Sequence, residues 1–99
     1  MKNDFDAEEL SSIVYEFMYN HNLIDDYKKY IDKITHYAMI IDSPKPRDIW
    51  EQNQDITNLE NAKGDFMIAA MYDERVSCSD LYDFSDEFNE YMSRIWRHI

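Results

Sequence analysis

Residues 10–18 read LSSIVYEFM, and their apolar members are Leu10, Ile13, Val14, Phe17 and Met18. Positions spaced i, i+3, i+4, i+7 and i+8 lie on one side of an α-helix, so this stretch predicts an amphipathic helix. Asp6 followed by Glu9 has the spacing of a capping box, with Asp in place of Ser or Thr. We therefore expect the helix to begin near Ala7 and to stop around residues 20–22.

Three further segments carry the same periodicity. The first of them covers residues 23–41 and stops before residues 43–46, Ser-Pro-Lys-Pro, because proline cannot continue a helix. The next is predicted over residues 56–74, after a short helical turn opened by Pro46 and a break in the polar residues 51–55. The last covers residues 81–99, with Ser79 or Ser85 as its cap.

Four amphipathic helices joined by short loops and one longer polar connection predict an all-α fold, a small bundle in which residues 1–99 form a single acidic helical domain. One Gly and two Pro are too few for the turns of a sandwich or a barrel. Five methionines lie on or near the apolar stripes and are expected to fill the core: Met18, Met39, Met67, Met71 and Met92. No apolar run approaches the roughly 20 residues of a membrane span, and the N-terminus lacks a signal-peptide pattern, so we expect a cytoplasmic protein.

The charge of the chain is its most informative feature. It has 21 Asp and Glu against 10 Lys and Arg, a net charge of -11. Residues 4–26 hold seven acids and no Lys or Arg, and residues 73–90 hold seven acids with Arg75 as the single base. Like charges one turn apart destabilise a helix, by about 0.2–0.5 kcal/mol per pair, so the bias indicates selection for a negative surface. Such a surface repels nucleic acid and anionic membranes and attracts a basic protein.

Two sets of residues are candidates for contact with that partner. In the last helix, acids recur every three or four residues beside a tyrosine that lies off the apolar stripe: Asp80, Tyr82, Asp83, Asp86, Glu87 and Glu90. The first helix offers a matching set: Glu8, Glu9, Tyr15, Glu16 and Tyr19. Tyrosine among carboxylates is a common composition of interaction hot spots. The plainer alternatives are a solvated face that keeps the protein soluble and tyrosines that pad the edge of the bundle.

Carboxylates about 5 to 6 Å apart along a helix are comparable in spacing to the phosphates of a nucleic-acid strand. Arg and Lys side chains that bind nucleic acid can therefore also bind such a column. In size, acidity and helicity, the whole chain is similar to phage-encoded nucleic-acid mimics that block restriction or CRISPR enzymes and to immunity proteins that neutralise nuclease toxins. The resemblance implies a non-enzymatic inhibitor that occludes a nuclease or another nucleic-acid-binding protein. The alternative is a small helical adaptor or regulatory subunit of a larger complex.

Patterns for catalysis and metal binding are weak. Pairs such as Asp25-Asp26 and Asp86-Glu87 have no nucleophilic or basic companion, and the three histidines have no second ligand at a suitable spacing. We therefore expect no enzyme activity, no cofactor and no metal. The single Cys78 cannot form an internal disulfide and is expected to be a small packing residue.

Basic residues are concentrated in one part of the sequence: Lys28, Lys29, Lys33, Lys45 and Arg47. They could pair with the acidic face of a second copy and produce a homodimer. They could equally relieve charge repulsion within the monomer.

Overall fold

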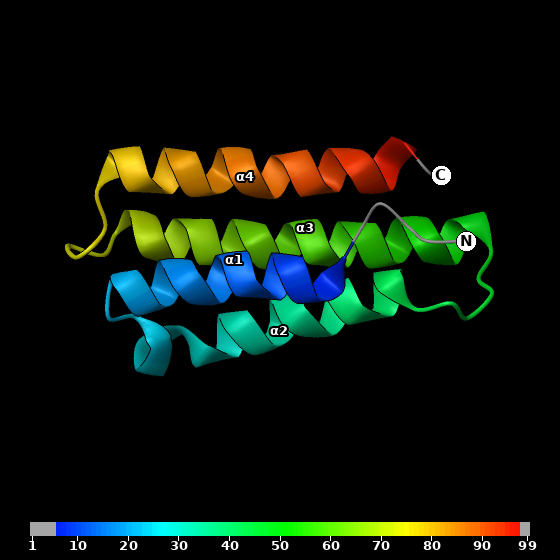
Figure 1. Cartoon of the computed structure of the whole chain (residues 1–99), viewed down its shortest axis with the longest axis horizontal. Helices are drawn as coiled ribbons and strands as arrows, with labels where there is room; N and C mark the ends of the chain where they lie inside the picture. Colours follow the sequence, from blue (N-terminus) through cyan, green and yellow to red (C-terminus); the bar gives the residue numbers. More distant parts are fainter. Residues whose placement is uncertain (1–5, 98–99) are drawn as a thin grey trace.

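The computed structural model describes residues 6–97, and within that range the side chains of residues 6–95. Its helices are α1 (Ala7–Asn20), α2 (Ile24–Asp42), α3 (Ile49–Met71) and α4 (Cys78–Arg97). Successive helices run in opposite directions, and no strand occurs within the described range (Figure 1). The predicted all-α bundle is confirmed, and the predicted end of its last helix at Ile99 lies outside the described residues.

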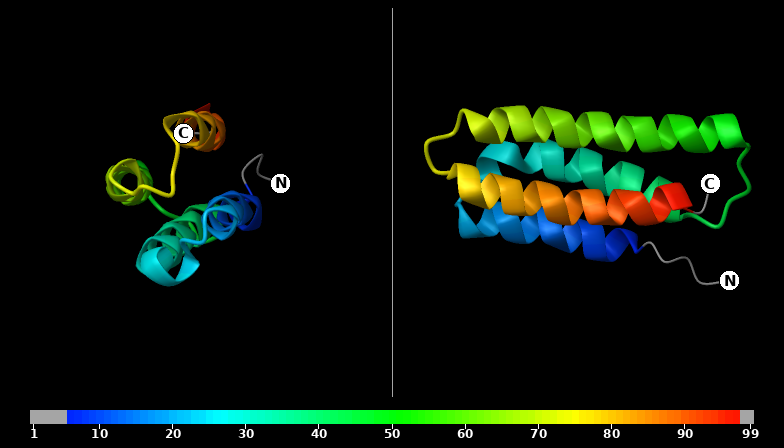
Figure 2. Two further views of the ribbon diagram at one scale, coloured as in Figure 1. Left: turned by 90° about the vertical axis from the view of Figure 1, so that its left-hand side faces the viewer. Right: turned by 90° about the horizontal axis from the view of Figure 1, so that it is seen from above.

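The helices occupy the four corners of the bundle, as the end-on view shows (Figure 2). α1 packs against α2 and α4, and α3 also packs against α2 and α4. α1 and α3 therefore lie diagonally across the core from each other. None of the helices in the described part of the chain is long and apolar enough to cross a membrane.

The apolar stripes meet in one core with Phe66 of α3 at its centre. The Phe66 ring lies 5.6 Å from the ring of Phe17 on α1 and 5.0 Å from that of Phe84 on α4. The ring of Tyr27 on α2 lies 6.0 Å away, so Phe66 contacts an aromatic ring from each of the other helices. All three contacts are edge-to-face, a geometry that contributes about 0.5–1.5 kcal/mol per pair beyond area burial.

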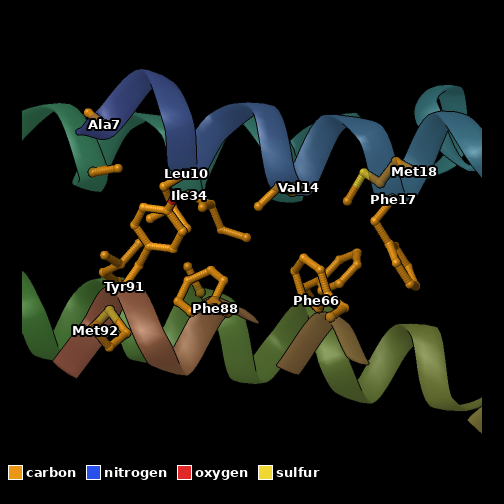
Figure 3. Close-up of a cluster of buried hydrophobic side chains, with 14 of the residues drawn as sticks. Ala7, Leu10, Val14, Phe17, Met18, Ile34, Phe66, Phe88, Tyr91 and Met92 are labelled. Carbon is orange, nitrogen blue, oxygen red and sulfur yellow. The ribbon is translucent and has the colours of Figure 1, made fainter. Parts of the chain in front are cut away.

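Further along the bundle, aliphatic side chains of α1 point toward aromatic side chains of α4 (Figure 3). Leu10 and Val14 are fully buried on α1, and Phe88 and Tyr91 are buried on α4. The periodic positions quoted from residues 10–18 thus form the inner side of α1, as predicted.

The start of α1 and the end of α2 follow the expectations. The Asp6 carboxylate accepts hydrogen bonds from the backbone N–H groups of Glu8 (3.0 Å) and Glu9 (3.4 Å), which fixes the start of α1. α2 ends at Asp42, one residue beyond the predicted limit, with Ser43 extended ahead of Pro44.

The predicted break before the third helix is wrong. α3 is continuous from Ile49 to Met71, and Asp48 caps its start by accepting a 2.7 Å hydrogen bond from the backbone N–H of Glu51. The polar residues 51–55 are therefore exposed or half-buried positions of a continuous helix. The helix also ends three residues before the predicted limit of 74, because the chain turns after Met71.

The cap of α4 is also different from the prediction. α4 begins at Cys78, and the residue before it, Ser77, accepts a 3.2 Å hydrogen bond at Oγ from the backbone N–H of Asp80. Neither Ser79 nor Ser85 has this role, because both lie within the helix.

Two methionines do not fill the core as predicted. Met18 and Met92 are buried and Met67 is half-buried, but Met39 and Met71 are 61% and 58% exposed. Apolar surface therefore remains on the outside of α2 and α3.

Candidate functional site

α1 and α4 lie side by side and antiparallel (Figure 2). Near one end, Tyr91 of α4 lies beside Glu9 of α1, and burial together with this carboxylate raises the pKa of Tyr91. At the other end, Nε2 of His21 lies 3.7 Å from Oδ2 of Asp80. These contacts fix the register of the two helices and bring the two acidic blocks of the sequence next to each other.

The seam between these helices is bordered by exposed carboxylates, which we call the acidic face: Glu9, Glu16, Asp83, Glu87 and Glu90. The two glutamates of α1 are seven positions apart, and the three acids of α4 follow i, i+4, i+7 spacing, so each set forms one row. The register places Glu16 level with the turn of α4 that carries Asp83 and Glu87. Among the side chains that the structure describes, none of these carboxylates forms an ion pair.

The remaining predicted residues of α4 lie to either side of this row. Asp80 is turned toward His21 and is 51% exposed at its side chain. Asp86 lies on the other side, near Lys63 of α3: burial lowers the pKa of Lys63, and the charge of Asp86 opposes that shift. Tyr82 is 72% exposed and precedes Asp86 by one turn, so it also lies toward α3. The column predicted from sequence is therefore divided between an outward row and two flanks.

On α1, the structure separates the predicted residues in the same way. Glu8, Tyr15 and Tyr19 form a strip about 100° around the helix from Glu9, on the side away from α4. Tyr15 is 52% exposed and Tyr19 is 66% exposed. These tyrosines are therefore accessible to a partner and lie beside the acidic face. Asp4, the first acid of the N-terminal block, lies outside the described residues.

A second charged cluster, which sequence reasoning missed, joins two loops at one end of the bundle. Arg75, after α3, places Nη2 2.8 Å from Oδ2 of Asp73 and Nη1 2.7 Å from Oδ2 of Asp26. Its Nη1 also donates a 2.9 Å hydrogen bond to the carbonyl oxygen of Asn22 between α1 and α2. Asn22 has a positive φ of 57°, a conformation that Asn adopts more readily than most residues. The Arg75 cluster thus ties the α1–α2 loop to the α3–α4 loop.

Electrostatics in the Arg75 cluster favour one protonation state. The hydrogen bonds from Arg75 hold the pKa of Asp73 well below its usual range. The Tyr27 hydroxyl donates a 2.7 Å hydrogen bond to Asp73, and burial together with this bond raises the pKa of Tyr27 to about 12. Asp73 is therefore ionised and Tyr27 neutral near pH 7, and both groups are occupied within the protein.

The only signal for this cluster in the sequence was that Arg75 is the single base of its acidic block. The members of this cluster could not be identified because they are distant in sequence: Tyr27 and Asp73 are 46 positions apart. Two acids from the predicted blocks, Asp26 and Asp73, are thus used to hold the loops.

The basic residues do not form a single cluster. Arg47 lies at the α2–α3 connection, where Nη1 is 3.0 Å from Oδ2 of Asp55 and the side chain is 12% exposed. Lys29 and Lys33 lie toward the other end of α2 and line a groove with α3. Lys33 is 3.8 Å from Asp65 across this groove.

Within the described residues, no group of three or more His, Cys, Asp or Glu side chains is arranged to hold a metal ion. Cys78 is exposed at the start of α4, so its predicted role in packing is wrong.

Comparisons with protein-family models, curated proteins and solved structures found no match to the chain.

Proposed function

We propose that this protein is a non-enzymatic inhibitor that binds a basic, nucleic-acid-handling protein through the acidic face and takes the place of the nucleic acid. Proteins of this class include anti-restriction and anti-CRISPR proteins and the immunity proteins of nuclease toxins. A target of this kind places the inhibitor in the cytoplasm. The observation that supports the proposal is the pair of exposed carboxylate rows on α1 and α4 that form no ion pairs among the described residues.

The dimensions of the acidic face suit a nucleic-acid site. Each row extends over seven residues, or about 10 Å of helix. Neighbouring helices pack with their axes roughly 8–10 Å apart, which is within the range of the groove widths of B-DNA, roughly 6–12 Å. Arg and Lys side chains arranged to hold phosphates can donate charge-assisted hydrogen bonds to such rows.

Aromatic side chains extend this surface. Tyr19 and Tyr82 are exposed on the two helices that carry the acidic face, and each brings a large contact area with few rotatable bonds. Contact with them adds affinity that salt does not screen.

A capture experiment with a matched control tests this proposal. The acidic-face variant carries Asp83→Asn, Glu87→Gln and Glu90→Gln. The control variant carries Asp25→Asn, Asp32→Asn and Glu74→Gln, which removes the same charge from exposed positions elsewhere. We expect a basic nucleic-acid-binding protein to be captured from the native host by the parent and the control, and to be lost with the acidic-face variant. Mass spectrometry identifies the captured proteins. Equal capture by the parent, the control and the acidic-face variant would contradict the proposal.

The adaptor alternative is distinguished by salt. Binding through the acidic face should weaken steeply between about 50 and 500 mM salt, because the Debye length falls from roughly 10 Å at 0.1 M toward 3 Å at 1 M. A salt-independent affinity would favour an adaptor that binds through an uncharged surface.

A further inference from the structure

α3 exposes large apolar side chains on the side that faces away from the core. Trp50 is 71% exposed and Ile68 is 58% exposed. They are 18 residues apart, which is five turns of an α-helix, so they point in the same direction about 27 Å from each other. Tyr72 follows one turn later and is 79% exposed. We call the positions on this side the α3 outer face: Trp50, Gln54, Thr57, Asn61, Gly64, Ile68 and Tyr72.

The α3 outer face is uncharged, although the chain as a whole has a net charge of -11. It also contains Gly64, which is unfavourable within a helix compared with Ala. A Cβ added at Gly64 would meet nothing within 4 Å, so packing inside the monomer does not require glycine. A glycine at such a position allows the backbone of another helix to approach closely.

A groove lies at the Tyr72 end of the same side, between α2 and α3. It has a volume of about 550 Å³, and its walls include Lys29, Tyr30, Lys33, Ile68 and Tyr72, together with Asp65, which pairs with Lys33. Aromatic rings and ammonium groups together suit an indole, which stacks on rings and attracts cations to its face. Trp50 lies at the opposite end of the α3 outer face, too far away to reach this groove in its own chain.

We infer that two copies of this chain associate through their α3 outer faces as an antiparallel, two-fold symmetric dimer, with Trp50 of each copy in the groove of the other. A two-fold axis perpendicular to α3 brings the Trp50 end of one copy to the Tyr72 end of the other, and the contact forms twice. Asn61 and Gly64 lie near the middle of the paired helices, where the backbones approach most closely. The face is therefore complementary to itself.

Charges beside the α3 outer face agree with this pairing. Glu51 is exposed next to Trp50, and the rotation of about 100° per residue places it on the side of α3 that faces α2. The two-fold axis keeps that side on the same edge of the interface, so Glu51 of one copy meets Lys29 of the other, beside the Lys33–Asp65 pair. In a two-fold symmetric dimer each contact forms twice, so both contacting surfaces must lie within one interface. The groove and the acidic face lie on different sides of the bundle, so they cannot meet in such a dimer.

The dimer leaves the acidic face free. α1 lies diagonally across the bundle from α3, and the carboxylate row of α4 borders the seam with α1, so both rows face away from the interface. The inference does not depend on the proposed function, because a dimer can form whether or not the acidic face binds a basic protein.

Sedimentation equilibrium between about 1 µM and 1 mM tests the pairing. The parent is expected to dimerise reversibly within this range. Trp50→Ala and Gly64→Gln should each weaken association at least tenfold, and Gly64→Gln should not impair folding because space is open around that position. Tyr19→Ala, which removes an equally exposed aromatic side chain from α1, is the matched control and should dimerise like the parent. A parent that stays monomeric throughout, or a Trp50→Ala variant that associates like the parent, would overturn the inference.

A charge exchange tests the orientation. Glu51→Lys and Lys29→Glu should each weaken the dimer, and the double variant should recover most of the parent's association. In the NMR spectrum, dilution should shift the amide signals of α3 and of the groove but not those of the acidic face. A double variant weaker than both single variants, or dilution shifts confined to α1 and α4, would refute the antiparallel pairing.

Discussion

The acidic face and the α3 outer face lie on different sides of one core and expose opposite chemistry. The acidic face has two rows of carboxylates without ion pairs among the described residues. The α3 outer face has no charged residue and exposes Trp50, Ile68 and Tyr72. The strong net charge of the chain is therefore distributed unevenly, and composition alone does not show where a partner binds.

The carboxylates of the protein are of two kinds. Asp26 and Asp73 are held by Arg75 at 2.7 and 2.8 Å and connect loops. The carboxylates of the acidic face make no such contact among the described residues, so they add repulsion to the monomer and are available to a basic partner.

The largest expected effect comes from the core that supports both faces. Phe66→Ala removes the ring that contacts α1, α2 and α4, and it should reduce the free energy of unfolding by about 3–5 kcal/mol. Urea denaturation followed by circular dichroism measures this loss. A loss below about 1 kcal/mol would show that the two faces do not depend on one shared core.

A matched pair of substitutions separates the two kinds of carboxylate. Asp73→Asn should lower the melting temperature because it weakens the contacts with Arg75 and Tyr27. Asp83→Asn removes the same charge from the acidic face and should leave stability unchanged or raise it by about 0.2–0.5 kcal/mol. Differential scanning calorimetry measures the melting temperatures of both variants. Equal destabilisation would show that Asp73 and Asp83 are not two different kinds of carboxylate.

The pH dependence of stability sharpens the same distinction. The pKa of Asp73 is lower in the folded than in the unfolded protein. Its contribution to the free energy of unfolding is therefore present above the unfolded pKa of about 3.9, and it is lost as the pH falls from there toward the folded pKa. The folded pKa of Tyr27 is raised to about 12. Its contribution to the free energy of unfolding is therefore present below about pH 10 and is lost between about pH 10 and 12.

Tyr27→Phe tests the alkaline limb of this profile. The variant should lose about 1 kcal/mol at neutral pH with the hydrogen bond to Asp73 and should show a flatter stability profile above pH 10. Denaturant titrations at several pH values provide the measurement. An unchanged alkaline profile would mean that another group is responsible.

The smallest expected effect on stability comes from the α3 outer face. Trp50→Ala should change the monomer's free energy of unfolding by no more than about 0.5 kcal/mol, because the side chain is 71% exposed. Measurement below the dimerisation range isolates the monomer. A loss of several kcal/mol would place Trp50 in the core and not on a contact surface.

Sequence periodicity was sufficient for the bundle because each stripe buries against the others. Leu10, Val14 and Phe88 are all buried where their spacing placed them. Periodicity failed at the start of α3, where the polar residues 51–55 hid a continuous helix. There the cap is supplied by Asp48, and Arg47 is bound to Asp55, contacts that a stripe of apolar residues does not reveal.

The candidate site was predictable only in part. All the predicted acids and tyrosines on α1 and α4 are exposed, as a contact surface requires. Their division between rows and flanks depends on the register of two helices about 70 residues apart in sequence, set by His21 with Asp80 and Glu9 with Tyr91. Neighbouring residues in sequence give no information on such pairs.

Competition with nucleic acid is the most direct test of the central claim that the acidic face takes the place of nucleic acid. The captured partner is mixed with a labelled duplex DNA or RNA that it binds, and the protein is titrated into the complex while fluorescence anisotropy is measured. We predict full displacement of the nucleic acid by the parent, with the acidic-face variant (Asp83→Asn, Glu87→Gln and Glu90→Gln) requiring a much higher concentration. A stable ternary complex, with nucleic acid still bound at saturating protein, would contradict the account.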